Sequence, residues 1–311
     1  MCNYSLFATV LYIQINIFQP WNLSVGGGVK YTHRLLVPYI LVSLILSGPL
    51  SLPLLARIFY GRPAGLMGLS HMWFLPCFFV SIVLYNIISS FARKENIQFL
   101  IILILALCSV FLSYDSNVSI LINGNLYHLT GWSTDSFQKQ YYIGFPFTLN
   151  ASLTGVVLIY MGRLVRKLFN RIDIAMSKLK VAVVLIICLG VGTICFLLNR
   201  NCLDNDFPYH LITMAHAIYG NYFLFLLTSI AFTVATLCIS IFIDNKFTSK
   251  IGTQTMAIYA FHPFVLSCIS VCLPFLPGAK GLIPSSIALI IIYFTIPLLR
   301  RIDSTLLGEI K

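Results

Sequence analysis

The stretch VAVVLIICLGVGTICFLL, from Val181 to Leu198, decides the fold of this protein. It contains no aspartate, glutamate, lysine or arginine. A helix needs roughly 20 predominantly apolar residues to cross the hydrocarbon core of a bilayer, so this stretch and its flanks predict a transmembrane helix. The stretch 97–113 is almost as apolar and predicts another one.

The composition of the whole chain extends this prediction. Of its 311 residues, 59% are hydrophobic and 9% are charged, and the mean hydropathy is +0.91. A soluble domain carries about 25% charged residues. We therefore expect an all-α, polytopic transmembrane helix bundle that forms one membrane domain across residues 1–311. Apolar runs predict about nine spans, near 4–18, 35–56, 71–90, 97–113, 146–162, 181–198, 221–243, 254–274 and 285–299.

The lysine and arginine residues are distributed unequally between the two sides of the predicted spans. The formal net charge is +11, a value that first suggests a nucleic-acid partner. If the loop 163–180 is cytoplasmic, however, alternation of the spans places 15 of the 20 lysine and arginine residues on the same side. Cytoplasmic loops of membrane proteins carry such an excess. The charge therefore predicts a multi-pass protein of the cell (inner or plasma) membrane with a cytoplasmic C-terminus, and it needs no nucleic acid.

Standard catalytic and metal-binding motifs are missing from the sequence. There is no GxSxG, GxGxxG, Walker A or HExxH motif. The nine cysteines form no CxxC pair and no Cys/His cluster with metal spacing, so we interpret them as small buried apolar residues rather than disulfides or metal ligands. The predicted spans contain almost no acidic residues, which argues against a proton-coupled transporter.

Four residues near or inside the predicted spans remain candidates for function. His71 and Trp73 begin the third span, His262 lies within the eighth, and Arg34 lies at the start of the second. An ionisable residue inside a membrane is costly unless it has a role. For the two histidines the alternative is a neutral imidazole that bonds a neighbouring helix, and for Arg34 it is anchoring at the cytoplasmic face. Trp73 offers either a stacking face for a sugar ring or an anchor at the membrane interface.

Four segments, in this chain order, carry a resemblance to a known family. They are THRLLVPYILVSLI (32–45), HMWFLPCFFV (71–80), PFTLNASLTGVVLIYMGRLVRK (146–167) and IGTQTMAIYAFHPF (251–264). Together they resemble the acyltransferase-3 family, integral membrane acyltransferases that O-acetylate cell-surface glycans. The segment YGNYFLFLLTSIAF (219–232) is similar to the fucose 4-O-acetylase subgroup.

The resemblance implies a membrane O-acyltransferase, and more narrowly an O-acetyltransferase. Its donor would be acetyl-CoA, and its acceptor a cell-surface or exported carbohydrate. By this resemblance Arg34 contacts the phosphates of the donor. His71 stands in as the catalytic base, and Trp73 and His262 line the substrate cavity. No metal takes part in the implied reaction.

The N-terminal region departs from the family pattern. Family members usually have ten spans, and the first carries an arginine, ten further residues and then the catalytic histidine. No arginine precedes Arg34 and no histidine precedes His33 in this sequence. We therefore expect that the first family helix is missing or disrupted, and that the 311-residue chain has little or no transferase activity. The alternative is a non-catalytic membrane protein, either an inactive remnant of the family or a carrier of glycans or lipids.

Overall fold

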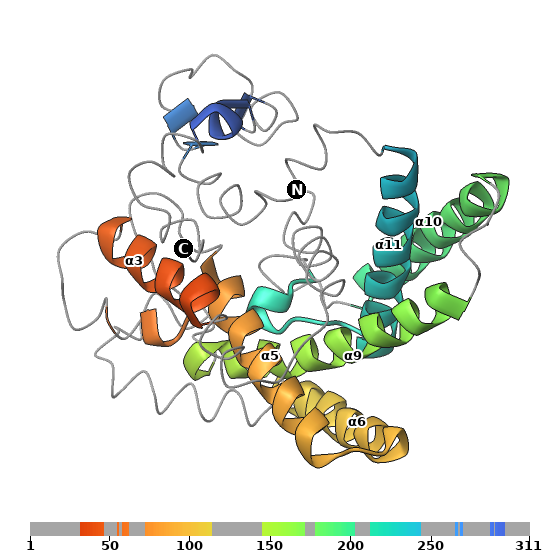
Figure 1. Ribbon diagram of the computed structural model, residues 1–311, viewed down its shortest axis with the longest axis horizontal. Coiled ribbons are helices and arrows are strands. Elements are labelled where there is room, and N and C mark those ends of the chain that lie inside the picture. Colours follow the sequence, from red (N-terminus) through yellow and green to blue (C-terminus); the bar gives the residue numbers. More distant parts are fainter. Residues whose placement is uncertain are drawn as a thin grey trace.

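The computed structural model describes residues 32–46, 72–113, 145–171, 178–202 and 212–243, with short pieces at 55, 58–61, 265–266, 268–269, 287–288 and 290–295. Within these ranges the regular structure is helical, apart from one isolated bridge between Thr213 and Ile218, and this confirms the all-α prediction. The elements drawn in Figure 1 are η1 (Thr32–Leu36), α3 (Val37–Leu46), α5 (Phe74–Phe91), α6 (Glu95–Phe111), η3 (Pro146–Thr148), α9 (Leu149–Arg171), α10 (Lys178–Arg200), η4 (Met214–His216) and α11 (Tyr222–Phe242).

The long helices match the predicted spans in the middle of the chain. By length and composition, α5, α10, α11 and the segment Pro146–Lys167 are each able to cross a membrane. Helix α6 is apolar as well, with 17 residues. The predicted span 35–56 overlaps α3 in its first half. The predicted span 4–18 lies outside the described residues, and the spans 254–274 and 285–299 are described only in short pieces, so the number nine stays a prediction.

Helix α11 illustrates how an apolar span accommodates hydroxyl groups. Its start is capped by Asn221, whose side-chain oxygen accepts from the backbone N–H groups of Phe223 and Leu224. Further along, four hydroxyls donate to the carbonyl oxygen one turn earlier, those of Thr228, Ser229, Thr233 and Thr236. Polar groups in lipid must find partners within the protein, and the preceding turn supplies them here.

Helix α9 packs against α5, α6 and α11 and is central to the described part of the chain (Figure 1). Early in both helices, the Ser81 hydroxyl of α5 donates to the carbonyl of Ser152 in α9 at 2.9 Å. Further along both, Arg163 of α9 donates to the hydroxyl of Tyr85 at 3.1 Å. Since the contacts advance together along the two helices, α5 and α9 run parallel.

Helix α6 runs in the opposite direction to α9. Glu95 at its start forms an ion pair with Lys167 near the end of α9. Ser109 near its end shares a hydrogen bond of 2.5 Å with Thr154 near the start of α9. These two contacts, at opposite ends of the pair, fix the antiparallel arrangement.

Helices α10 and α11 form an antiparallel pair beside α9 (Figure 1). The Asn199 side chain, at the end of α10, donates to the carbonyl of Tyr219 at 2.9 Å and accepts from the N–H of Asn221 at 2.7 Å. Thr154 in turn bonds Tyr219, just before α11. The end of α10 and the start of α11 therefore lie at the same end of the bundle as the start of α9.

The five long helices alternate in direction and share two ends. We call one the hydroxyl end: α5, α9 and α11 begin there, and α6 and α10 finish there. The other is the basic end, which holds the opposite helix termini. This alternation is the one the sequence predicts for consecutive membrane spans.

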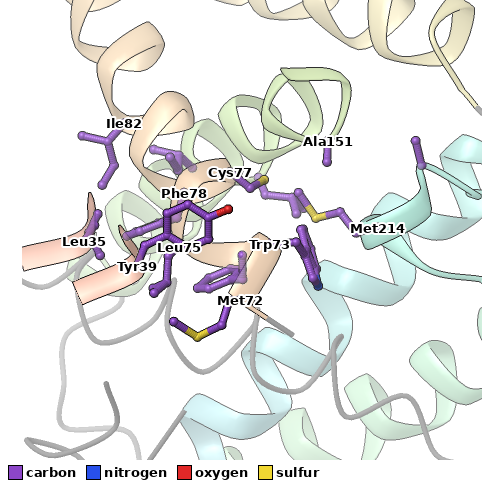
Figure 2. Close-up of a cluster of buried hydrophobic side chains, with 14 of the residues drawn as sticks. Leu35, Tyr39, Met72, Trp73, Leu75, Cys77, Phe78, Ile82, Ala151 and Met214 are labelled. Carbon is purple, nitrogen blue, oxygen red and sulfur yellow. The ribbon is translucent and has the colours of Figure 1, made fainter. Parts of the chain in front are cut away.

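The largest core cluster lies along the first half of α5 (Figure 2). Leu35 and Tyr39, from η1 and α3, belong to it together with Met72, Leu75 and Phe78. The Tyr39 hydroxyl donates to the carbonyl of Ile58 at 2.6 Å and ties α3 to the turn at 58–61. Helix α3 is thereby packed along the first half of α5 and tied to the turn at 58–61.

Candidate functional site

Four hydroxyl groups, from α6, α9 and the start of α11, meet at the hydroxyl end. The Thr154 hydroxyl of α9 shares a 2.5 Å hydrogen bond with Ser109 of α6 and donates to Tyr219 at 2.9 Å. Tyr222 of α11 lies 3.3 Å from the same Thr154 oxygen. We call Ser109, Thr154, Tyr219 and Tyr222 the hydroxyl cluster. It joins α6, α9 and α11, and the side chains of Ser109, Thr154 and Tyr219 are buried.

The hydroxyl cluster is electrically neutral. Desolvation by burial raises the pKa of Tyr219 above its ordinary value, so its phenol keeps the proton at any physiological pH. Neutral hydroxyls can accept and donate hydrogen bonds at once. The cluster can therefore hold a polar group by hydrogen bonding, but it contains no base able to take a proton near neutral pH.

A second polar contact lies on the face of α9 that meets α5. The Ser81 hydroxyl donates to its own helix at the carbonyl of Cys77, at 2.8 Å, as well as to Ser152. The Ser152 hydroxyl donates to the carbonyl of Thr148 at 3.0 Å. Gly155 makes this approach possible, because an added Cβ would fall well inside van der Waals contact of the Ser81 oxygen.

The backbone entering α9 is strained. Phe147 and Thr148 have φ angles of 51° and 54°, in the left-handed region that β-branched residues rarely adopt. Thr148 is buried, and Gly61, itself at φ 75°, packs so closely that a Cβ there would lie 2.6 Å from the Thr148 methyl group. Ala217 adds another left-handed residue, at φ 53°, in the turn after η4. Such strain persists where surrounding structure enforces it, and it concentrates at functional sites.

Trp73 lies directly before α5, at the hydroxyl end. Its indole is 4% exposed and packs edge to face on Phe74, with the ring centroids 5.9 Å apart. Figure 2 shows it beside Met214 of η4, which belongs to the same core cluster. The structure thus places one predicted site residue in the core cluster that also contains Met214 and Ala217. Its role in a substrate cavity stays a prediction.

The other predicted site residues cannot be compared with Trp73 in this way. His71 and His262 lie outside the described residues, and so does the side chain of Arg34. The backbone of Arg34 belongs to η1, which packs against α5. The predicted grouping of these residues around one cavity stays a prediction.

The polar residues of α9 are not among the predicted site residues, although the sequence carries a signal for them. Asn150 and Thr154 are four residues apart, and so are Thr148 and Ser152, followed by Gly155. These spacings give the start of the helix two polar faces. A span with two polar faces needs protein neighbours on both, and α5 on one side with α6 and α11 on the other supply them.

The basic end holds a different polar network, centred on Arg163. One guanidinium nitrogen of Arg163 donates to Tyr85 of α5 at 3.1 Å and to the side-chain oxygen of Gln98 of α6 at 2.9 Å. The Gln98 amide nitrogen donates to the carbonyl of Ala92 at 2.7 Å. Glu95 pairs with Lys167 and lies 3.8 Å from the second guanidinium nitrogen. The network ties the α5–α6 turn to α9.

Comparison with known proteins gives one significant match, which is to a protein family. The family model described as an acyltransferase domain, that of the acyltransferase-3 family, matches residues 30–299. Neither the curated proteins nor the solved structures give a significant match. The match covers all the long helices described above, including both polar networks. The chain therefore belongs to the acyltransferase-3 family of membrane acyltransferases.

Proposed function

We propose that this membrane acyltransferase moves an acetyl group from acetyl-CoA to a hydroxyl of a cell-surface or exported carbohydrate, as the fucose 4-O-acetylase-like subgroup does. The observation that carries the proposal is the chemical difference between the two ends of the bundle. The basic end suits an anionic cytoplasmic donor. The hydroxyl end combines buried hydroxyls, strained backbone and the aromatic Trp73, which suits a neutral polyhydroxylated acceptor.

The orientation of the protein follows from the same difference. Among the described residues outside η1, the basic end carries Arg93, Lys94, Arg163, Arg166, Lys167, Arg171, Lys178 and Lys180, whereas the hydroxyl end carries Arg200. Positive residues accumulate on the cytoplasmic side of membrane proteins. In the cell (plasma or inner) membrane the basic end would thus face the cytoplasm, as would the C-terminus.

The proposed reaction needs a donor contact, a base and stabilisation of the oxyanion. Arg34 would hold a phosphate of acetyl-CoA through two parallel hydrogen bonds from its planar guanidinium. Because no histidine precedes His33, His71 would take the proton of the acceptor hydroxyl as its oxygen attacks the thioester carbonyl. With this substitute base we expect turnover by the 311-residue chain to be very low. The carbon–sulfur bond then breaks, and the leaving CoA thiolate takes up a proton. Trp73 and His262 would line the cavity in which the sugar lies.

Binding of the donor tests this proposal directly. Purified protein in lipid nanodiscs should bind acetyl-CoA saturably, and Arg34→Ala should weaken that binding by about 1–3 kcal/mol, or about 5- to 150-fold. Arg34→Lys should also weaken it, because lysine keeps the charge but loses the planar fork. Arg200→Ala, at the hydroxyl end, is the matched control and should leave the affinity unchanged. Absence of saturable binding, or equal affinity in Arg34→Ala, would favour a carrier or an inactive family member instead.

Cysteine labelling tests the orientation. In a background without native cysteines, Arg200→Cys should react with an impermeant maleimide on intact cells. Lys167→Cys should react only after the membrane is opened. The reverse pattern would place the basic end outside and overturn the proposed path of the donor.

A further inference from the structure

The Arg163 side chain at the basic end is held by hydrogen bonds from one guanidinium nitrogen, while part of its surface remains exposed to solvent. Both Tyr85 and Gln98 accept from the same guanidinium nitrogen, and the Gln98 amide is itself oriented by its bond to Ala92. The Arg163 side chain nevertheless keeps 39% of its surface exposed. A planar guanidinium held in this way is pre-organised to bind an oxyanion with its remaining donors.

The charge around Arg163 is unbalanced. Arg93, Lys94, Arg166 and Lys167 lie in the same turn or the same stretch of α9, and Glu95 is the sole acidic residue in the described part of the chain. Glu95 is shared between Lys167 and Arg163, and its side chain is 63% exposed. One carboxylate cannot neutralise this group of five cations, so the corner favours an additional anion.

The same corner is bordered by exposed apolar side chains. Phe91, directly before the turn, is 86% exposed. On α6 the exposed residues Phe99, Leu103 and Val110 recur at helical spacing and form an apolar strip on the same side of the helix as Glu95. This strip borders α9, because the Phe99 ring lies 6.5 Å from the ring of Tyr160, measured between centroids. A ligand that suits the corner must therefore offer an anion to Arg163 and hydrocarbon to α6.

We propose that the corner formed by the α5–α6 turn and the end of α9 binds the headgroup of an anionic phospholipid. The negatively charged phosphate of the headgroup contacts Arg163 and Lys167, and the acyl chains lie along the apolar strip of α6. Basic pockets between transmembrane helices bind anionic headgroups in this manner. The bound lipid joins α6 to α9 at the basic end, much as the hydroxyl cluster joins them at the other. The proposal is independent of the acceptor and donor proposed above.

The experiment compares lipids of opposite headgroup charge on the purified protein. In neutral phosphatidylcholine nanodiscs, titrated phosphatidylglycerol should raise the thermal unfolding temperature, and lipid-resolved native mass spectrometry should detect a retained phosphatidylglycerol molecule. Arg163→Gln and Lys167→Gln should each weaken retention by about tenfold. Arg163→Lys should fall between wild type and Arg163→Gln, because the charge remains and the planar fork is lost.

Matched controls separate a site from general attraction to a charged surface. Lys178→Gln removes one exposed positive charge at the same end, outside the corner, and should leave retention unchanged. If Arg163→Gln fails to fold, Lys167→Gln carries the test, because Lys167 contacts only Glu95 among the residues named here. Equal retention of phosphatidylcholine and phosphatidylglycerol, or equal losses in Lys167→Gln and Lys178→Gln, would overturn the proposal. Displacement of the lipid by millimolar acetyl-CoA or inorganic phosphate would also overturn it, since the corner would then bind a soluble phosphate.

Discussion

Helices α9 and α10 are neighbours in the chain and have 23 residues each, yet they solve the problem of crossing a membrane in opposite ways. In the most apolar part of α10 the mean hydropathy is 3.0 and 11% of the residues are buried. In the segment Pro146–Lys167, which contains most of α9, the values are 1.3 and 67%. The less apolar helix is therefore the more buried one. In a soluble protein the more apolar helix lies inside.

The reason for the inversion is that lipid is as apolar as a leucine side chain. Burying Ile186 or Ile194 of α10 against protein gains no hydrophobic energy over burying them against lipid, and both side chains remain exposed. A hydroxyl group such as that of Ser152 or Thr154, by contrast, must find a partner inside the protein. Small and polar residues therefore mark the helix that other helices surround.

The largest expected effect compares two glycines, one in each helix. Gly155→Leu in α9 forces a side chain into the space of Ser81, and we expect destabilisation of at least about 3 kcal/mol, the upper end for overpacked cores. A Cβ added at Gly190 in α10 meets no atom within 4 Å, so we expect Gly190→Leu to change stability little. Unfolding of both variants in detergent micelles, followed by thermal melting, measures the difference. Equal melting temperatures would contradict the central position of α9.

The next prediction concerns Asn199, the polar residue that α10 buries. Asn199→Leu leaves the carbonyl of Tyr219 and the N–H of Asn221 without their partner, so we expect a loss of about 1–3 kcal/mol for an unsatisfied buried group. The exposed Asn201 provides the control, because Asn201→Leu should change stability little. If the two variants melt alike, the contact between the end of α10 and the start of α11 contributes nothing to stability.

A smaller effect is expected within the hydroxyl cluster. Thr154→Val keeps the shape of the side chain and removes the hydroxyl that bonds Ser109 and Tyr219. Hydrogen bonds between membrane helices contribute about 0.6 kcal/mol on average and about 1.7 at most, which sets the expected loss. Thr193→Val, on the exposed face of α10, is the matched control. A double-mutant cycle with Ser109→Ala should recover the coupling energy, and a coupling of zero would refute the shared hydrogen bond.

The smallest expected effect on stability comes from comparing two glycines on different faces of α10. Gly190→Ala should stabilise the helix by up to about 1 kcal/mol, since alanine is the better helix former and the site is open. Gly192→Ala should gain nothing, because its Cβ would lie 3.1 Å from the ring of Phe232 in α11. A gain of equal size in both variants, measured by the same melting assay, would argue that α10 does not pack on α11 through Gly192.

The candidate site could be predicted from the sequence only in part. The sequence indicates Trp73 as a residue of interest, and the structure places it in the core cluster beside Met214 of η4. The roles proposed for Arg34, His71 and His262 rest on the family resemblance, and the donor-binding experiment tests that of Arg34. The hydroxyl cluster was missed, because serine and threonine in an apolar span are common and usually bond their own helix, as Thr228 does.

The sequence by itself determined that this is a helical membrane protein, where its central spans lie, and which helix ends carry the positive charge. These properties are sums over neighbouring residues, since hydropathy and charge act on each span separately. Only the tertiary structure decided that α9 is central, that Ser109, Thr154 and Tyr219 meet, and that Arg163 is held between Tyr85 and Gln98. Those contacts join residues 45 to 78 positions apart in the chain, and they depend on the register in which separate helices pack. A local sequence pattern does not specify that register. Any apolar helix face can contact lipid, so which face packs against another helix depends on the residues of that helix.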